Sequence, residues 1–357
     1  MDIKRYLKTM VERDASDIFF KVGMPVMLRQ ACGLVAASEE RLSLRDVQGV
    51  VDEISGSRSG DTLRENLDVD FSWSVDEVGR FRASVFFQRG EPMVVLRYIR
   101  SSIPGFEQLN LPAAVLEKLC RETRGLIFIT GIAGSGKSTT IASMIEYINN
   151  TSHRHILSIE DPIEYIFQDK GSIITQRELG IDVKSYPVAL RQVALQSVDV
   201  IYIATIRDRE TMQAAITAAD MGMLVLATIH SVNAYQTIER IINLFPPHQH
   251  NEVRAQLSLL LRGVVSLRLL PAKDGKGRIP AYETMVATPT ISRLIREGKT
   301  WELLRFIEQG KLFGMQSFKQ SLSELIREDK VDKEQALGFA DSRDELELEL
   351  QGIRGTS

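Results

Sequence analysis

The second half of the chain contains short runs of consecutive apolar residues, and segments with helical periodicity separate these runs. The runs cover Leu126–Thr130, Ile156–Ile159, Val200–Ile203 and Met223–Ile229. Strands without alternating polar positions are usually buried on both faces, which is typical of a parallel sheet covered by helices. The pattern predicts an α/β domain in this part of the chain.

The first hundred residues follow another pattern, in which short strands mix with a helix. The predicted helix covers Leu44–Ile54, and the predicted strands cover Asp17–Phe20, Val26–Arg29, Asp70–Ser74, Arg80–Gln88 and Met93–Ile99. Glycine and proline within residues 89–92 predict a turn between the last two strands. One face of the strand before this turn carries Arg82, and the other carries Phe81, Ala83, Val85 and Phe87. We expect the apolar face to join the core of a small domain.

Proline and glycine separate the two parts at residues 101–112, where the sequence SSIPGFEQLNLP predicts a linker. Beyond Thr290 the pattern is helical, and we expect the acidic run DELELEL near the C-terminus to be solvated or frayed. The predicted organisation is a domain over residues 1–100, the linker over 101–112, an α/β core over 113–289, and a helical region with an acidic tail over 290–357.

Composition and charge narrow the class of protein. The 357 residues include 44 lysines and arginines against 47 acidic residues, a net charge of −3 that offers nucleic acid no overall basic field. Every apolar stretch is far shorter than the roughly 20 residues of a membrane span, and the N-terminus MDIKRYLKTM lacks an apolar signal core. Two cysteines, Cys32 and Cys120, are too few for a four-thiolate zinc site. We expect a cytoplasmic protein.

A glycine-rich loop directly follows the apolar strand Leu126–Thr130. Its sequence GIAGSGKS fits the phosphate-binding pattern G-x-x-x-x-G-K-[ST], and the helical segment Ser138–Tyr147 comes next. Glycines let consecutive N–H groups face the phosphates of a nucleotide, and the helix N-terminus adds its positive end. We expect Lys137 to reach the β- and γ-phosphates and the Ser138 hydroxyl to ligate Mg²⁺. The candidate nucleotide-binding residues are Gly131, Gly134, Ser135, Gly136, Lys137, Ser138 and Thr139.

Three carboxylates follow the predicted strand Ile156–Ile159, namely Glu160, Asp161 and Glu164. The carboxyl ends of parallel strands face the ligand crevice, so Glu160 is a candidate for holding the Mg²⁺ shell or for orienting a water. The alternative is an acidic turn that Pro162 shapes at the end of the strand.

His230 follows the predicted strand Met223–Ile229 and begins the polar run His-Ser-Val-Asn. At this end of a strand such a run can sense the γ-phosphate, which makes His230 another candidate site residue. The alternative is a capped turn between strand and helix, with Asn233 as the helix N-cap.

In their order along the chain, these motifs resemble the secretion-type ATPases, and more narrowly the type IV pilus retraction ATPases, the PilT/PilU kind. The resemblance rests on the segments GIAGSGKSTT, SIEDPIEY, VDVIYIATIRDRET and LATIHSVNAYQTIERIINLFP. It extends to ERDASDIFF and RFRASVFFQRGEPMVVLRYI near the N-terminus and to SRLIREGKTWELLRFIEQGKLFGMQSFKQSL near the C-terminus. Pilus-assembly and type II secretion ATPases usually carry a long extra N-terminal domain and a four-cysteine metal site. Their absence here favours the retraction branch.

The resemblance implies a PAS-like N-terminal α+β domain followed by a RecA-like P-loop ATPase domain with a helical C-terminal region. It implies a homo-hexameric ring that binds ATP and Mg²⁺ and drives pilus retraction in twitching motility. The expected partners are the inner-membrane platform protein of a type IV pilus machine and a paralogous retraction ATPase. The protein would be cytoplasmic, and these partners would hold it at the inner membrane.

Arginines of the N-terminal domain approach the nucleotide in this family, and the matching positions here are Arg82 and Arg97. The turn at Gly90 would bring their two strands side by side. A guanidinium offers a fork of donors to the γ-phosphate oxygens as the phosphoryl group leaves. The alternative is a pair of solvated strand arginines.

One position departs from the family pattern. After the strand that corresponds to Val200–Ile203 the family has Gly-Glu, whereas this chain has Ala204-Thr205. A threonine hydroxyl can hydrogen-bond a water but cannot take its proton at neutral pH. Two hypotheses stay open: a motor that hydrolyses ATP, slowly or with Glu160 as a substitute, and a non-hydrolysing nucleotide-binding subunit of a pilus machine. A motor on nucleic acid is disfavoured by the net charge.

Overall fold

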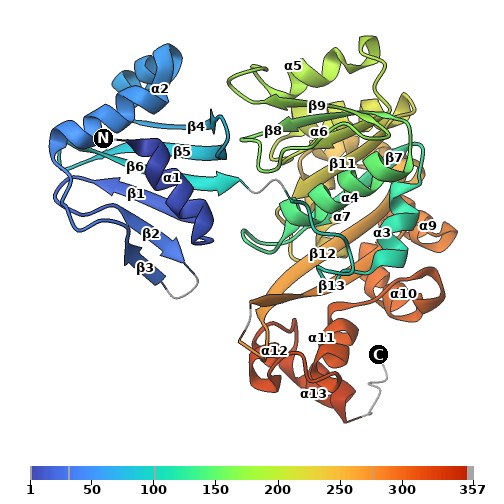
Figure 1. Ribbon diagram of the computed structural model, residues 1–357. Coiled ribbons are helices and arrows are strands. Elements are labelled where there is room, and N and C mark those ends of the chain that lie inside the picture. The colour runs from blue at the N-terminus through green and yellow to red at the C-terminus, as the bar shows by residue number, and fades with distance from the viewer. Residues whose placement is uncertain (1, 31–32, 100–101, 276, 352–357) are drawn as a thin grey trace. The chain divides into compact units, whose positions relative to one another are not determined.

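The computed structural model describes residues 2–30, 33–99, 102–275 and 277–351, and the chain divides into two compact units (Figure 1). The first unit contains Met1–Ser102 together with Pro162–Ile166, and the second contains Ile103–Asp161 together with Phe167–Ser357. Each unit has its own sheet and its own buried apolar core. Within the described ranges, no helix has the length and apolar content that crossing a membrane requires.

The first unit is built on an antiparallel sheet with the strand order β3-β2-β1-β6-β5-β4. Its elements are α1 (Ile3–Glu12), β1 (Asp17–Lys21), β2 (Met27–Gln30), β3 (Gly33–Ala36), α2 (Leu44–Asn66), β4 (Asp68–Val75), β5 (Gly79–Gln88) and β6 (Glu91–Ile99). The side chain of Asp2 caps α1 by accepting the backbone N–H of Arg5, and α1 buries Ile3, Leu7 and Met10 in the core. Five of these strands and α2 confirm elements expected from the sequence.

The expected alternation in β5 is correct for three apolar residues and wrong for the fourth. Phe81, Ala83 and Val85 are completely buried, but Phe87 is 39% exposed. Phe87 pairs with Pro92 beside the turn at Arg89 and Gly90, beyond the last buried residue of the strand. The strand is therefore longer than the core that it covers.

The second unit contains a mostly parallel sheet with the strand order β13-β12-β7-β11-β10-β8-β9, in which only β12 and β13 pair antiparallel. Its strands are β7 (Gly125–Thr130), β8 (His155–Glu160), β9 (Ile173–Glu178), β10 (Val200–Ile203), β11 (Leu224–Ile229), β12 (Leu261–Pro271) and β13 (Arg278–Val286). Every residue of β7, β10 and β11 is buried, as continuous apolar strands predict. The mixed α/β architecture expected from the sequence is confirmed.

Helices cover the sheet of this unit and continue to the C-terminus. They are α3 (Ala113–Cys120), α4 (Lys137–Thr151), α5 (Tyr186–Arg191), α6 (Arg209–Asp220), α7 (Ala234–Asn243), α8 (His250–Leu260), α9 (Pro289–Glu297), α10 (Leu303–Gln309), α11 (Phe318–Arg327), α12 (Lys333–Gly338) and α13 (Arg343–Leu350). Short 3₁₀ helices cover Val193–Leu195, Pro247–Gln249, Thr300–Glu302 and Lys311–Phe313. Figure 1 shows α11, α12 and α13 gathered at one end of β12 and β13.

The expectation that the acidic run DELELEL is solvated or frayed is correct for most of its side chains, which are exposed or half-buried, but the backbone of the run is helical and not frayed. This run lies in α13, which Ser342 caps by accepting the backbone N–H of Glu345. Leu346 is fully buried with Phe318 and Leu322 of α11 in a separate apolar cluster. Leu350 packs against the same cluster, so two leucines anchor a helix that is otherwise mostly charged.

The two tryptophans of the chain belong to different units. Trp73 in β4 is half-buried, with its ring centre 6.2 Å from that of Phe81. Trp301, between α9 and α10, is 71% exposed, and Leu312 and Phe313 further along are also exposed. The second unit therefore presents large apolar side chains to solvent in the segment between α9 and α11.

Candidate nucleotide site

Four neighbouring parallel strands, β7, β11, β10 and β8, bring the predicted site residues of the second unit to one edge of the sheet. The glycine-rich loop starts directly after β7, and His230 directly follows β11. Thr205 is the second residue after β10, and Glu160 is the last residue of β8. The carboxyl ends of parallel strands are where α/β proteins bind ligands, so the topology places these groups at a ligand-binding edge.

The loop after β7 can only be built with glycine at its first position. Gly131 has φ +145°, and a Cβ there would lie 2.3 Å from the hydroxyl oxygen of Ser135 and 2.6 Å from the carbonyl oxygen of Leu267. The loop thus closes directly against β12. The Ser135 hydroxyl is buried, and among the described residues it has no hydrogen-bond partner. A loop with such an unused polar atom, leading into the N-terminus of α4, suits an anionic ligand.

Lys137, the first residue of α4, is folded back over the loop. It is 8% exposed, and its Nζ donates to the carbonyl oxygens of Gly131 at 3.0 Å and Ile132 at 2.7 Å. Ser138 and Thr139 follow in the first turn of α4 and are half-buried. In this arrangement the ammonium group and the backbone N–H groups of the helix start converge on the loop, as phosphate binding requires.

Glu160 is held in a fixed orientation by two neighbours. It is 3% exposed, and its Oε1 accepts the hydroxyl of Ser158 at 2.6 Å and the amide Nε2 of Gln176 at 3.1 Å. Ser158 lies two residues earlier in β8, and Gln176 lies in β9, a strand that the sequence pattern did not indicate. Polar contacts therefore orient Glu160, whereas Asp161 and Glu164 of the same segment are exposed.

Thr205 is fixed by its two chain neighbours. The backbone N–H of Ala204 donates to the carbonyl of Ile159 at 3.0 Å, and the N–H of Ile206 donates to the carbonyl of Thr228 at 2.9 Å. The backbone at Thr205 is therefore bound to the ends of β8 and β11 at once. Its half-buried side chain starts from the rim on which Glu160 and His230 also lie.

His230 has a pKa below the ordinary range, and several groups explain this. Burial lowers the pKa most, and the positive charges of Lys137 and Arg207 lower it further, whereas a hydrogen bond to the backbone of Gly131 opposes the change. The ring is thus neutral at pH 7. Asn233 does cap α7 by accepting the N–H of Gln236, so the capped turn exists beside the histidine.

The structure adds two residues that the sequence analysis missed. The hydroxyl of Tyr186 is buried and lacks a hydrogen-bond partner among the described residues. Burial and the charges of Asp161 and Glu160 raise the pKa of Tyr186, and Arg207 opposes them. Tyr186 and Arg207 therefore lie near the acidic turn. Nothing in the pattern singles out Tyr186, but Arg207 lies only two residues after Thr205.

Arg82 and Arg97 belong to the first unit and face each other across β5 and β6, as the turn at Gly90 predicts. Arg82 donates to Asp70 at 3.1 Å, and Arg97 donates to Asp17 at 2.8 Å. Asp17 is buried, but both arginines remain partly exposed. The pairing is confirmed, and each arginine has a carboxylate partner within its own unit.

A hollow of about 290 Å³ adjoins the loop and the start of α4. Its lining includes Leu109, Leu111, Thr139, Thr140, Leu269 and Pro280. Apolar walls next to a phosphate-binding loop suit the flat base of a nucleotide. In the described ranges, no cluster of three or more histidine, cysteine, aspartate or glutamate side chains is arranged to hold a metal.

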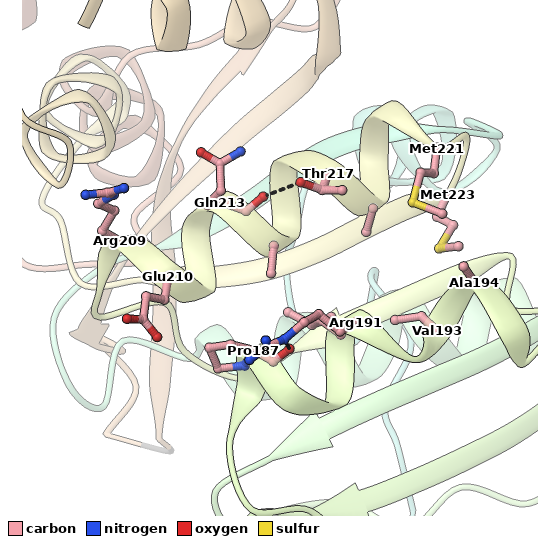
Figure 2. Close-up of a pocket in the computed structure, with 13 residues that line it drawn as sticks. Pro187, Arg191, Val193, Ala194, Arg209, Glu210, Gln213, Thr217, Met221 and Met223 are labelled. Atoms are coloured by element: carbon pink, nitrogen blue, oxygen red, sulfur yellow. Dashed lines mark hydrogen bonds between the residues drawn. The ribbon is translucent and has the colours of Figure 1, made fainter. Parts of the chain in front are cut away.

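Another hollow, of about 570 Å³, lies between α5 and α6 and is lined mostly by apolar groups (Figure 2). Arg191 and Pro187 face it from α5, and Gln213 and Thr217 lie on α6, where the Thr217 hydroxyl donates to the carbonyl of Gln213. None of the predicted site residues lines this hollow. It is therefore separate from the nucleotide site.

Comparison with known proteins gives relatives over almost the whole chain. Residues 2–328 match the family described as Type II/IV secretion system protein. The chain is 40% identical to the type IV pilus ATPase PilU of Pseudomonas aeruginosa, over 98% of this chain and 92% of the relative. It is 36% identical to the type IV pilus retraction ATPase PilT of the same organism, over 94% and 97% of the two chains.

A solved structure agrees with these relatives. The crystal structure of the pilus retraction motor PilT with bound ADP has a TM-score of 0.91 and 42% identity to this chain. The match covers 97% of this chain and 99% of that one. Sequence and fold therefore agree over both units, and the chain belongs to the type II/IV secretion system protein family, in its group of PilT/PilU type IV pilus ATPases.

Proposed function

We propose that the protein is an ATP-hydrolysing motor of type IV pilus retraction, and that its substrate MgATP binds at residues 131–139. The observation that carries the proposal is the edge where the glycine-rich loop, His230, Thr205 and Glu160 end four neighbouring strands. Relatives named as a type IV pilus ATPase, a retraction ATPase and a retraction motor, at 36–42% identity, support the same function.

The nucleotide would lie with its phosphates on the loop and its base in the hollow beside α4. Lys137 would exchange its carbonyl partners for β- and γ-phosphate oxygens, and Ser138 would ligate the Mg²⁺ that accompanies ATP. The base would contact Leu109, Leu111 and Leu269. The supporting observations are the glycine at position 131 and the unused Ser135 hydroxyl.

Hydrolysis needs a group that orients and deprotonates the attacking water. Thr205 can donate a hydrogen bond to this water or accept one from it, but its hydroxyl cannot act as the base. We assign the base to Glu160, because Ser158 and Gln176 fix its carboxylate at the neighbouring strand end. Neutral His230 would contact the γ-phosphate as a hydrogen-bond partner.

The proposed assembly is a homo-hexameric ring. In it, Arg82 and Arg97 would stabilise the charge that develops on the transferred phosphoryl group. The proposed partners are the inner-membrane platform protein of the pilus machine and a paralogous retraction ATPase, which would keep a cytoplasmic ring at the membrane. The similarity to pilus ATPases supports this assembly. We also propose that the domain limits predicted from the sequence hold for the protein.

A second function is favoured by one observation, the threonine at position 205. A subunit without its usual carboxylate can bind ATP and act structurally in the machine without hydrolysing it. The two functions differ in magnesium-dependent turnover.

The test is steady-state phosphate release and calorimetric ATP binding by the full chain, by Lys137→Ala and by Lys118→Ala. Lys118 is an exposed lysine in the last turn of α3 and serves as the matched control. We expect Lys137→Ala to lose ATP binding or turnover and Lys118→Ala to match the parent. Equal binding and turnover in all three proteins would refute the site. ATP binding without turnover in the parent would support the non-hydrolysing subunit.

A further inference from the structure

Glu283 is a buried carboxylate that joins two helices. It lies in β13, is 2% exposed, and its Oε1 accepts the backbone N–H of Ala234 at 2.7 Å. The backbone of Phe318 makes a further hydrogen bond to the same side chain. Ala234 is the first residue of α7 and Phe318 is the first residue of α11. One carboxylate thus binds the N-termini of two helices that are far apart in sequence.

The two backbone groups are not satisfied by the ordinary helix caps. Asn233 accepts the N–H of the third residue of α7, and Ser317 does the same for α11. N–H groups in the first turn have no partner within their own helix. Glu283 accepts the two N–H groups that the capping side chains do not reach. The positive ends of both helices stabilise its charge. Even so, burial raises the pKa of Glu283 to about 7.

Arg268 on the adjacent strand β12 connects the same segments. Its guanidinium lies 3.8 Å from the ring centre of Phe318 and donates to Asp341 at 2.6 Å. A longer contact of 3.5 Å leads to the carbonyl of Val232, in the turn that starts with His230. The positive charge of Arg268 lowers the pKa of Glu283, and the negative charge of Asp341 raises it. Together, the two side chains bind the His230 turn, α11 and the turn before α13.

The contacts of Glu283 and Arg268 adjoin the nucleotide site at two points. Ala234, which Glu283 binds, begins α7 directly after the turn and comes four residues after His230. Leu267, which precedes Arg268, has its carbonyl against Gly131 at the start of the phosphate loop. A ligand that moves the loop or the turn therefore acts on segments that are bound directly to the C-terminal helices.

We propose that Glu283 is a positioning residue that couples the nucleotide site to the helices α11–α13. It holds the His230 turn and the start of α11 on one carboxylate, so a shift of either helix end displaces the other. Arg268 links the turn before α13 to the same two helix ends, so that this turn moves with them. The inference rests on the proposed nucleotide binding and extends it to a part of the chain outside the phosphate loop.

The test is hydrogen exchange of the full chain, followed by mass spectrometry, with and without saturating MgADP. The variants are Glu283→Gln, which keeps the shape and an acceptor oxygen, and Glu283→Ala. Thr284→Val is the matched control, because this equally buried neighbour donates to the carbonyl of Gly314 and ties β13 only to the loop before α11. Calorimetry gives the MgADP affinity of each protein.

We expect MgADP to slow exchange in residues 318–350 of the parent and of Thr284→Val by threefold or more. In Glu283→Gln this effect should fall by at least half, and in Glu283→Ala it should disappear, while the affinity for MgADP changes less than threefold. Unchanged nucleotide effects in Glu283→Gln, or no effect on residues 318–350 in a parent that binds MgADP, would overturn the coupling and leave the proposed function intact. A parent that binds no nucleotide would overturn both.

Discussion

Lys137 and His230 share one hydrogen-bonding group, the backbone of Gly131 at the start of the phosphate loop. The ammonium of Lys137 is held at 3.0 Å from the Gly131 carbonyl, and its charge helps to keep the imidazole of His230 neutral. Phosphate groups that draw the lysine away and add negative charge should have the opposite effect on the histidine. We therefore expect the protonation of His230 to depend on the occupancy of the loop.

The first prediction concerns the pKa of His230. We expect it to lie below the usual value of about 6.5, and to rise on addition of MgADP and in Lys137→Ala, because MgADP adds negative charge and Lys137→Ala removes a positive charge. Burial keeps part of the lowering in both cases. NMR titration of the five histidine C2 protons measures this, and His230→Gln identifies the resonance.

The lowered pKa of His230 also makes the stability of the protein depend on pH. Since the folded state protonates His230 at lower pH than the unfolded state does, the unfolded chain binds more protons between the two pKa values. The free energy of unfolding should therefore lose a contribution as pH falls below about 6.5, and His230→Gln should lack this contribution. A titration at the ordinary pKa with no response to MgADP would contradict the linkage.

The second prediction concerns Thr205→Glu. If the missing carboxylate limits hydrolysis, this change should raise turnover tenfold or more, about 1.4 kcal/mol off the barrier. ATP affinity should stay equal or fall slightly, because a new carboxylate near the γ-phosphate adds repulsion. Steady-state phosphate release measures the first effect and calorimetry the second.

The backbone around Thr205 provides the control. Ala204 is bound to Ile159, so the start of a longer side chain at position 205 is fixed, and the Cβ of Ala204 can obstruct its rotamer. The double change Ala204→Gly with Thr205→Glu removes that obstruction. If the parent turns over faster than both variants, Thr205 does not limit hydrolysis.

The third prediction tests Glu160 as the base. Glu160→Gln keeps the size of the side chain and an oxygen for Ser158 and Gln176, so ATP binding should persist. Turnover should fall by about a hundredfold to ten-thousandfold, which is the usual loss for a well-placed acid or base. Glu164→Gln, an exposed member of the same acidic segment, is the matched control. Equal turnover of Glu160→Gln and the parent would assign the base elsewhere.

The fourth prediction is that Arg97 contributes more than Arg82 to the stability of the protein. Arg97→Ala leaves the buried Asp17 with Arg29 at 3.7 Å as its remaining charge partner, so we expect a loss of about 1–3 kcal/mol in unfolding free energy. Arg82→Ala breaks a partly exposed ion pair and should cost less than about 1 kcal/mol. Denaturant unfolding measures both values.

In a ring with the proposed roles, both arginine variants should lose turnover while they still bind ATP, because the lost contact is made in the transition state. Arg97→Lys keeps the charge for Asp17 and controls for the loss of stability. Full turnover in both alanine variants, or a monodisperse monomer in the presence of ATP by light scattering, would contradict the ring and its arginines.

The parallel sheet of the second unit could be predicted because its central strands are apolar at every position. Edge strands lack that signal: β9 has the mixed sequence IITQRE and is only partly buried, so the pattern gave no indication of the strand that supplies Gln176 to Glu160. In α13 the leucines alternate with glutamates, which hides a helix that the burial of Leu346 stabilises. Tertiary contacts decide both cases.

Site residues at strand ends were predictable for the same reason as the strands that carry them. Glu283 was not, since it lies within β13 and its partners come from α7 and α11, 49 and 35 positions away in the sequence. A single carboxylate in the strand sequence RIPAYETMV was the available signal. Only the fold shows that two helix ends converge on it.

Each unit contains one of the two tryptophans, Trp73 in the first and Trp301 in the second. The intrinsic fluorescence of the protein is therefore the sum of two emitters, one shielded beside Phe81 and one open to water. Iodide should quench the red-shifted emission of Trp301 and largely spare that of Trp73. With Trp73→Phe and Trp301→Phe as single-emitter variants, the solvent exposure of each unit can be followed separately, without a label, as nucleotide or partner subunits are added.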